Sequence, residues 1–414
     1  MEVGVLGGGA GGMMAALFAA RAGAHVALLE QNEKLGKKLF ITGKGRCNLT
    51  NAAKGQDFLA GVVRNPRFLY SALHFFSNEQ LCALMEGEAG VPLKVERGGR
   101  VFPASDKSSD VLKGLERLLG HSYVRVSLRT RVLALEPLAQ GGFLVTTNLG
   151  QKRFDRIVLA TGGLSYPSTG SDGSGFALAR TLGHRIEPLL PSLAPIETVE
   201  EWPKGLSGLT LKNVTLTAKR GKKKLFSELG EMLFTHFGIS GPLVLSLSAK
   251  ITGEPLEDIG LQLDLKPGLT QEQLLARLDR DIAQAPKKQL QSLLHGLEPK
   301  ALSPILALQA GVAEETPCYQ LNDRQKQALA QAVKGLPLRP KALRPVEEAI
   351  VTRGGVSVKE VDPHTMESKL VKGLYFAGEM LDVDAVTGGY NLQIAFSTGA
   401  LAGHSAAGGE EALG

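Results

Sequence analysis

The sequence predicts an α/β protein of the Rossmann type, and three glycine-rich segments support that prediction. An apolar run at residues 3–6 leads directly into the cluster Gly7–Gly12 and an Ala-rich stretch. A second apolar run ends in Ala160–Gly163, and a third, Gly373–Glu379, is soon followed by Gly388–Gln393. A buried strand that runs into glycines at the start of a helix is typical of a nucleotide-binding βαβ unit. Because these segments lie near both ends of the chain, the predicted domain is discontinuous.

The first glycine cluster has the spacing GxGxxG, carried by Gly7, Gly9 and Gly12. Gly7 permits the tight turn, Gly9 lets the backbone reach a pyrophosphate, and Gly12 lets the helix approach the sheet. The N–H groups at the start of that helix favour phosphate charge. Glu30 ends the second predicted strand, where a carboxylate accepts hydrogen bonds from ribose hydroxyls and repels a 2′-phosphate. The segment therefore predicts an FAD or NAD site and disfavours NADP.

Apolar periodicity predicts the remaining elements. In chain order they are a helix at 10–22, a strand at 24–30, a loop at 31–52, helical segments at 66–89 and 108–119, and strand-like segments at 91–102, 124–135, 143–147 and 154–160. Strand-type alternation at 210–219 and 259–265 indicates a small all-β module, whereas leucines at helical spacing indicate a helical insert. The predicted domains are 1–188, a first nucleotide-binding part; 189–270, all-β; 271–335, helical; 336–345, a return linker or strand; and 346–414, the second nucleotide-binding part, with a closing helix at 388–403.

The composition is that of an ordinary folded protein, with 43% hydrophobic and 21% charged residues. The net charge of +6 suits an anionic ligand such as a pyrophosphate but is too small to indicate nucleic-acid binding by itself. Cys47, Cys82 and Cys318 form no CxxC pair and no metal-ligand pattern, so a reducing, cytoplasmic setting and no metal site are predicted. The apolar run Met13–Ala20 is too short to cross a membrane before Arg21, and neither export nor a membrane span is expected.

The second and third glycine-rich segments favour FAD over NAD. Ala160–Gly163 resembles the strand end at which flavoproteins with two dinucleotide-binding folds re-enter the flavin domain. Gly373–Glu379 resembles their late strand, whose acidic residue contacts the ribityl and pyrophosphate portion. Gly388–Gln393 opens the last helix, and a helix start facing the N1/C2=O edge of the flavin would stabilise negative charge on the reduced ring. Together they predict a non-covalent FAD site, without a dedicated nicotinamide domain because no clear second GxGxxG is present.

Four longer segments resemble the aminoacetone-oxidase-like and BaiN-like bacterial FAD-binding proteins. They are Lys37–Asn51, Gly230–Pro242, Glu348–Val356 and Met366–Gly399. The resemblance covers essentially the whole chain. It implies a two-dinucleotide-binding-fold flavoprotein with a discontinuous FAD domain, an inserted β-barrel-like domain and a helical insert.

Apart from Val132, in the predicted strand at 124–135, the residues predicted to bind FAD lie in or beside the glycine-rich segments, at the end of the second predicted strand, and in the loop Lys37–Asn48. By the resemblance, this loop lies against the cofactor. The predicted binding residues are Gly7, Gly9, Ala10, Gly11, Gly12, Glu30, Gln31, Lys37, Lys38, Gly45, Arg46, Cys47, Asn48, Val132, Thr161, Gly162, Gly163, Tyr166, Gly378, Glu379, Gly389, Tyr390, Asn391, Leu392 and Gln393.

Within the loop, Lys37, Lys38 and Arg46 offer cationic donors for the phosphates or for the N1/C2=O edge of the flavin. Lys44, flanked by glycines, is equally consistent with a solvated side chain. Two interpretations of Cys47 stand: a redox-active thiol near flavin, or, favoured, a small packed residue.

Three residues are candidates for the chemistry itself. His236, in a glycine-flanked apolar segment, suits a general acid or base, although a structural histidine is the favoured interpretation. Arg353 suits an anionic substrate or the flavin edge, while Tyr390, like Tyr166, either borders the ring or packs in the core. Asp382 and the nearby Asp384 either orient the Gly388 loop or cap it.

The sequence thus predicts an FAD-dependent oxidoreductase that transfers a hydride between flavin N5 and a small organic substrate. The resemblance leaves amine oxidation and C=C reduction open. The electrons come either from NAD(P)H, as a transient donor, or from the substrate itself, and the acceptor is either O2 or an organic compound. The alternative is a flavin-dependent RNA-modifying protein, for which the basic run Lys219–Lys224 gives weak support because it is most simply a solvated hairpin tip. Nucleic acid and membranes are not expected as partners.

Overall fold

The structure, a computed structural model, describes residues 1–409 of the chain. Two compact units are present. The first comprises Met1–Ser192 together with the chain from Pro345 onward, and the second comprises Leu193–Arg344. The borders expected from the sequence are residues 188 and 346. The last five residues of the predicted segment 346–414 lie outside the described part.

A five-stranded parallel sheet forms the centre of the first unit. Its strand order is β20-β10-β1-β2-β6, and every neighbouring pair is parallel. The strands are β1 (Glu2–Leu6), β2 (His25–Leu29), β6 (Arg125–Ser127), β10 (Arg156–Leu159) and β20 (Leu374–Phe376). From β1 the chain moves to β2 on one side and later returns to β10 on the other. Such a reversal beside one strand is where open α/β sheets bind ligands, at the carboxyl ends of the strands.

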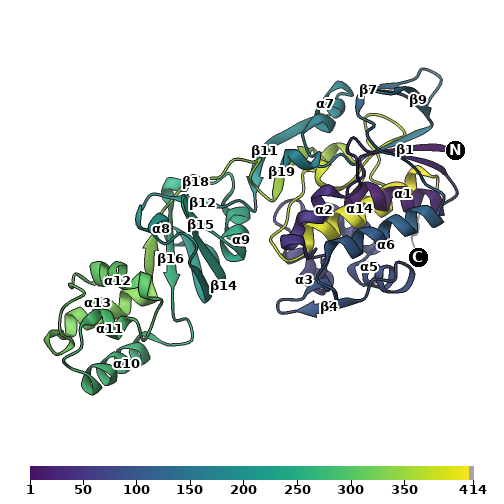
Figure 1. Ribbon diagram of the computed structural model, residues 1–414. Helices are drawn as coiled ribbons and strands as arrows, with labels where there is room; N and C mark the ends of the chain where they lie inside the picture. Colours follow the sequence, from purple (N-terminus) through teal and green to yellow (C-terminus); the bar gives the residue numbers. More distant parts are fainter. Residues whose placement is uncertain (410–414) are drawn as a thin grey trace. The chain divides into compact units, whose positions relative to one another are not determined.

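The first and last helices of this unit pack directly on each other. Figure 1 shows α1 (Ala10–Arg21) alongside α14 (Tyr390–Ala406). A Cβ on Gly399 would lie 2.2 Å from the carbonyl oxygen of Gly11, and one on Gly403 would lie 2.0 Å from that of Ala15. Only glycine fits such contacts, so the two ends of the chain are joined by backbone-to-backbone packing.

Smaller elements complete the first unit. They are α2 (Lys37–Ile41), β3 (Thr50–Asn51), α3 (Gly55–Ala60), α4 (Tyr70–Phe75), α5 (Asn78–Ala83), β4 (Leu93–Glu96), β5 (Arg100–Pro103), α6 (Ser108–His121), β7 (Val132–Pro137), β8 (Phe143–Thr147), β9 (Gly150–Phe154), α7 (Ser174–Thr181), β11 (Ile186–Ser192) and β19 (Val351–Val356). The predicted loop at 31–52 was wrong in one respect, because it contains α2 and a 3-10 turn at Thr42–Gly45. α7 and β9 were not predicted, being short and without clear periodicity.

The second unit is built on a seven-stranded antiparallel sheet, in the order β17-β16-β13-β14-β15-β12-β18. Its strands are β12 (Ile196–Thr198), β13 (Thr210–Arg220), β14 (Lys223–Thr235), β15 (Gly238–Ser240), β16 (Ile259–Asp264), β17 (Leu336–Leu338) and β18 (Pro340–Leu343). The two edge strands, β17 and β18, are separated in the chain by Arg339 alone. The sheet must therefore curl until its edges approach, which is the barrel-like form that the family resemblance implies.

The helices of the second unit share one hydrophobic core with this sheet. They are α8 (Trp202–Gly205), α9 (Pro242–Ile251), α10 (Gln271–Gln284), α11 (Leu290–Leu294), α12 (Ser303–Ala310) and α13 (Asp323–Lys334). Leu274 and Leu278 of α10 belong to the same buried cluster as Leu261 and Leu263 of β16. The sheet and the helices of Leu193–Arg344 thus pack as one body. Among the described residues, no helix combines the length and apolar character needed to traverse a bilayer.

Candidate functional site

The segments singled out in the sequence meet at one edge of the parallel sheet. Gly7 follows β1, Glu30 follows β2, Ala160 follows β10 and Ala377 follows β20. Because all five strands run in the same direction, these positions share the carboxyl edge. A Cβ on Gly7 would lie 2.4 Å from the carbonyl oxygen of Ala160, so the first two turns are in contact.

The glycines of the first turn serve different purposes. Gly7 has a φ of +106°, and a Cβ on Gly12 would lie 1.8 Å from the carbonyl oxygen of Gly7, so both are fixed by the fold. Gly11 packs beside Ala395 of α14, where a Cβ would lie 3.3 Å from the carbonyl oxygen. Gly9 differs, because a Cβ there would meet nothing within 4 Å. Open space in front of an uncapped helix start, at Gly9 and Ala10, suits a phosphate group.

Glu30 is buried beside this turn. One carboxylate oxygen accepts from the N–H of Gly8 at 2.7 Å, and the other accepts from the backbone N–H and the side-chain amide of Asn32 at 2.8 and 2.7 Å. The neighbouring Gln31 donates to the carbonyl oxygen of Gly170 at 2.7 Å. The N–H of Thr130 donates to the Glu30 carbonyl oxygen at 2.8 Å and so brings the start of β7, with Val132, to this end of the site.

The second carboxylate of the edge belongs to Glu379, whose side chain is 18% exposed. It pairs with Lys38 at 2.6 Å and accepts from the Ser165 hydroxyl at 2.9 Å and the N–H of Thr352 at 2.8 Å. Burial acts to raise the pKa of Glu379, but Lys38 and these hydrogen bonds outweigh it, and the pKa lies below its ordinary value. Lys38 also donates to Ser165 at 2.6 Å. Ser165 and Thr352 were missed, since a lone hydroxyl residue carries no local signal.

The turn after β10 packs around this carboxylate. A Cβ on Gly163 would lie 2.4 Å from the Thr352 hydroxyl and 2.7 Å from a Glu379 oxygen. Gly162 has a φ of +81°, and the Thr161 hydroxyl lies 2.9 Å from the sulfur of Met380. Gly378, with a φ of +68°, precedes Glu379. Tyr166 is half-buried with a φ of +54°, at the start of a 3-10 turn.

Three cations of the loop Lys37–Asn48 are held in ion pairs, namely Lys37, Lys38 and Arg46. Lys37 lies 3.3 Å from the Asn32 side chain and 3.5 Å from Glu33. Arg46 pairs with Glu96 and, at 2.6 Å, with Asp106, and its guanidinium stacks 4.2 Å over the ring of Phe102. The hydrogen bonds that Arg46 donates to Glu96 and, second, to Asp106 raise the pKa of Arg46 further above its ordinary value. Arg46 thereby fastens the loop to the β4–β5 hairpin.

Near the end of the loop, two of the residues predicted to bind FAD have a left-handed backbone conformation. Gly45 has a φ of +83° and Cys47 a φ of +59°. Cys47 is fully buried, and burial raises the pKa of its thiol to about 12, which fits the packed residue rather than a reactive thiolate. The Asn48 amide, oriented to suit both neighbours, accepts from the N–H of Gly389 at 3.1 Å and donates to the carbonyl oxygen of Thr50 at 3.3 Å. The loop thus reaches the start of α14.

At that start, Gly389 has a φ of +98°, and a Cβ there would lie 2.3 Å from the Thr50 carbonyl group. Tyr390 is half-buried, with its ring 4.9 Å from that of Phe58. Asn391 clasps the preceding loop, accepting from the N–H of Ala385 at 3.0 Å and donating to its carbonyl oxygen at 2.9 Å. Leu392, also half-buried, packs against the core of the unit.

Gln393 requires a correction. The side chain is fully buried, and its amide contacts the Thr50 hydroxyl at 2.7 Å, Ser397 at 3.0 Å and the Phe76 carbonyl oxygen at 3.3 Å. No atom of it is exposed to a ligand. Gln393 therefore joins α14 to β3 and α4 instead of binding the cofactor, and only the helix start before it faces the site.

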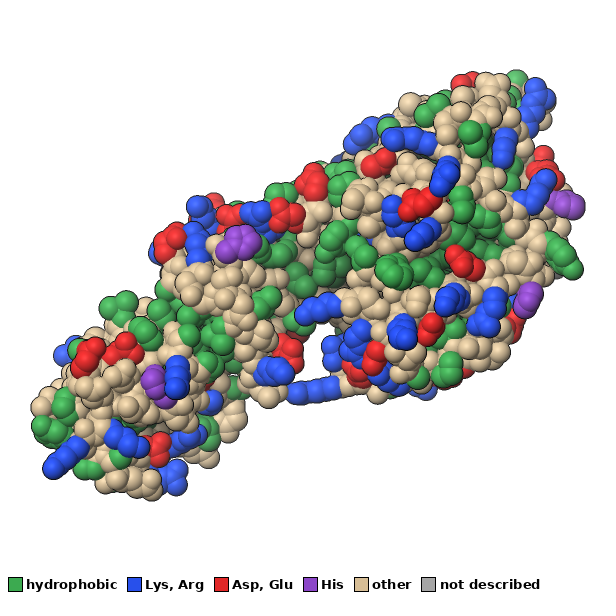
Figure 2. Space-filling model, in the orientation of Figure 1, with side chains coloured by type: hydrophobic (Ala, Val, Ile, Leu, Met, Phe, Trp, Pro, Cys, Tyr) green, Lys and Arg blue, Asp and Glu red, His purple; other side chains and the backbone are tan. Residues whose placement is uncertain are grey.

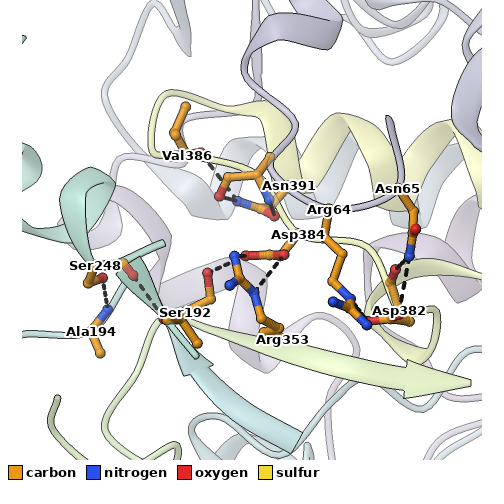
Figure 3. A network of polar contacts seen from close by, with 12 residues as sticks. Arg64, Asn65, Ser192, Ala194, Ser248, Arg353, Asp382, Asp384, Val386 and Asn391 are labelled. Atoms are coloured by element: carbon orange, nitrogen blue, oxygen red, sulfur yellow. Dashed lines mark hydrogen bonds and ion pairs between the residues drawn. The ribbon is translucent and has the colours of Figure 1, made fainter. Parts of the chain in front are cut away.

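The predicted chemical candidates are placed very differently. The Arg353 guanidinium is buried against Asp384 at 3.1 Å, so its charge is balanced within the protein and is not presented to an anionic substrate (Figure 3). His236 is exposed on the turn between β14 and β15 in the second unit, with its ring 4.9 Å from that of Phe237. Of the three, Tyr390 is the one that lies at the start of α14, beside the carboxyl edge of the parallel sheet.

The residues present fit FAD. The space over Gly9 accepts a phosphate that a side chain would exclude. Glu30 offers carboxylate oxygens for a ribose. Glu379 offers carboxylate oxygens on the other side of the point between β1 and β10 where the strand order reverses. The start of α14 supplies N–H groups without a side-chain cap. Among residues 1–409, no group of three or more His, Cys, Asp and Glu side chains could hold a metal ion.

Comparisons with known proteins agree with this geometry. Residues 1–405 match the family described as HI0933-like protein Rossmann domain. A 3-dehydro-bile acid delta(4,6)-reductase from Clostridium scindens is 36% identical over 411 residues, covering 98% of this chain and 99% of that protein. A ribosomal RNA dihydrouridine synthase from Escherichia coli is 32% identical over 397 residues, 95% of each chain. The solved structure of a 3-ketosteroid delta1-dehydrogenase from Sterolibacterium denitrificans, at 15% identity and a TM-score of 0.51 over 99% of both chains, shares the fold.

Proposed function

This chain belongs to the HI0933-like Rossmann family and is an FAD-dependent oxidoreductase, and from that premise we propose that it reduces a C=C bond conjugated to a carbonyl group. The observation that carries the proposal is the meeting of Gly9, Glu30, Thr161 and Glu379 at one sheet edge. The names of both relatives support the choice of reaction. A 3-oxo-Δ4,6 steroid and a uracil ring each hold a C=C bond conjugated to a carbonyl, and each product is saturated there.

Bound FAD supplies the hydride, from N5, to the carbon β to the carbonyl. The protein must hold the cofactor, exclude water, stabilise negative charge on the substrate's carbonyl oxygen and deliver a proton to the α-carbon. Glu30 accepts hydrogen bonds from the adenosine ribose, and the start of α1 receives the pyrophosphate. Lys38 and Glu379, paired at 2.6 Å, fix the ribityl side of the site with their charges balanced.

Tyr390 is the residue that we propose to deliver the proton. It begins α14, and its ring is wedged between Phe58 and Gly61, where a Cβ on Gly61 would lie 2.7 Å from the ring. That packing restricts the ring to one orientation, and a phenol hydroxyl can donate a proton or a hydrogen bond. Arg353, bound to Asp384, is assigned no such part.

Anaerobic stopped-flow spectroscopy tests the reaction. NADH or NADPH is expected to reduce the FAD of the purified protein, and a 3-oxo-Δ4,6 steroid acid is expected to reoxidise it, whereas the saturated steroid acid should leave it reduced. Bleaching of the flavin by a small amine such as aminoacetone, with no reoxidation by the conjugated substrate, would contradict C=C reduction and favour amine oxidation.

A second candidate substrate is a uridine in RNA, favoured by one observation in the second unit. The hairpin between β13 and β14 carries Lys222, Lys223 and Lys224, all exposed. Against it, Figure 2 shows Lys and Arg side chains interspersed with Asp and Glu on the face drawn, and Arg220 at the same hairpin pairs with Glu254. A small conjugated carbonyl compound is therefore the first candidate.

The RNA candidate has a direct test. If RNA is the substrate, replacing all three hairpin lysines by glutamine should weaken rRNA binding and lower the slope of affinity against salt concentration. The matched control replaces three exposed lysines of the helical stretch, Lys287, Lys288 and Lys300. Binding that neither triple variant changes would remove the hairpin from consideration.

A further inference from the structure

Two strands of the first unit form a ribbon through which the chain leaves and re-enters that unit. β11 and β19 pair in antiparallel fashion, from Ile186 with Val356 to Ser192 with Val351. Ser192 is the last residue before the second unit, and β19 begins shortly after the chain returns at Pro345. The ribbon also touches Glu379, because the N–H of Thr352 donates to it.

Both strands of the ribbon contact one carboxylate, that of Asp384 (Figure 3). The Ser192 hydroxyl donates to Oδ2 at 2.5 Å. Arg353 donates from Nε to Oδ1 at 3.2 Å and from Nη2 to Oδ2 at 3.1 Å. Asp384 is fully buried and the Arg353 side chain is 11% exposed, so two opposite charges lie together in a buried environment.

Asp384 lies in the segment that leads to the start of α14. The carbonyl oxygen of Asp384 accepts a hydrogen bond from the N–H of Val63 at 2.8 Å. Two residues further along the chain, the N–H of Val386 donates to the carbonyl oxygen of Gly61 at 2.9 Å. The Asn391 amide then binds both backbone groups of Ala385. The segment is thus fastened along its length, and Asp384 is its link to the ribbon.

We propose that Arg353 and Asp384 are a positioning pair that sets the reduction potential of the bound flavin. The pair fastens the turn before α14 to the ribbon, and its two buried charges cancel beside the site. The inference rests on the FAD site of the proposed function. A single uncompensated charge in a buried environment acts strongly on neighbouring charge. Reduced flavin carries negative charge, so a lone arginine would stabilise it and a lone aspartate would destabilise it.

Single substitutions of Arg353 and of Asp384 are therefore expected to shift the midpoint potential of the flavin in opposite directions. The potential is measured by dye equilibration on the FAD-loaded protein without substrate. Arg353→Gln should lower the potential and Asp384→Asn should raise it, while the double variant returns toward wild type. Arg353→Lys, which keeps the charge, should stay near wild type. The control Lys359→Gln removes an exposed charge beyond the same strand and should change nothing.

Shifts in the same direction, or none, would overturn the proposal, since loosened packing alone gives no sign reversal. If a single variant fails to fold, Ser192→Ala takes its place. It removes one donor from Asp384 and should lower the potential, and an unchanged value would then overturn the pairing. A protein that bound no FAD would refute the proposed function instead, and the identity of the reduced substrate does not enter this measurement.

Discussion

The backbone N–H of Gly8 donates to the Glu30 carboxylate over 2.7 Å, tying the turn after β1 to the end of β2. Asn32 supplies two more donors to the same carboxylate. An ionised carboxylate has about four acceptor positions, so the group is already oriented and keeps capacity for a ribose hydroxyl. The pairing makes Glu30 part of the fold and of the cofactor site at once.

Replacing Glu30 by alanine is expected to weaken FAD binding. The loss of a charge-assisted hydrogen bond costs about 1.5–3 kcal/mol, which corresponds to roughly a 10- to 150-fold higher Kd. Quenching of flavin fluorescence on titration into the apoprotein measures this. The control Glu33→Ala removes an exposed carboxylate three residues away and should leave Kd unchanged. Equal affinities for all three proteins would remove Glu30 from the site.

Alanine substitutions at Gly9 and Gly12 are expected to have different effects, the first on FAD binding and the second on folding. Gly9 has an ordinary φ of −79° and open space where a Cβ would be, so Gly9→Ala should keep the Tm of the apoprotein within about 2 °C of wild type. The added methyl group would occupy the place of the pyrophosphate and raise the Kd for FAD by roughly tenfold or more. Gly12→Ala should instead impair folding, because its Cβ would lie 1.8 Å from the Gly7 carbonyl oxygen. Thermal unfolding with and without FAD distinguishes the two, and a Gly9→Ala protein that binds FAD normally would contradict the pyrophosphate assignment.

Much of the nucleotide-binding framework was predictable because its signals are local. The turn at Gly7–Gly12, the acid at Glu30 and the glycines after Ala160 each follow a short apolar run, and the rule that parallel strands share a carboxyl edge brings them together. The close packing of α1 on α14 needs only small residues such as Gly399 and Gly403 on one helix face.

The side-chain pairings were not predictable in the same way. Arg46 was expected at the cofactor, yet its partners, Glu96 and Asp106, lie 50 and 60 residues away in a hairpin whose position depends on the whole fold. Arg353 and Asp384 are likewise joined only through tertiary structure, 31 residues apart. No periodicity or motif encodes which charges meet, so sequence patterns overestimated the number of cations free for a ligand.

The cysteines are expected to resist alkylation in the native state. Burial raises the pKa of Cys47 to about 12 and that of Cys82 to about 11, and it also raises the pKa of Cys318. Iodoacetamide attacks the thiolate, which is scarce at neutral pH when the pKa is this high. Mass spectrometry after brief treatment should find Cys47 unmodified in the native protein and modified after unfolding in urea. Fast native labelling at Cys47 would revive the interpretation of a reactive thiol beside the flavin.

Glu298 is expected to make the stability of the second unit depend on pH. Its side chain is 4% exposed, and burial raises its pKa from 4.5 to about 7 even though Lys266 lies 3.3 Å away. Between these two values the unfolded chain releases the proton while the folded chain keeps it. The native state then binds more protons, so its stability falls as pH rises through this window and levels off above it.

The shift sets an upper limit of about 3 kcal/mol on that loss. Glu298→Gln has no proton to lose, so its unfolding free energy should be flat over the window and exceed that of wild type at about pH 8. Chemical denaturation at about pH 5 and about pH 8 measures the difference, with the exposed Glu315→Gln as the matched control. A wild-type protein as stable at the higher pH as at the lower one would contradict the raised pKa of Glu298. A Glu298→Gln protein that keeps the wild-type slope would show that other groups cause the pH dependence. Stability that rises with pH instead would show that Lys266 holds the carboxylate ionised in the fold, because an ion pair lowers the pKa of an acid.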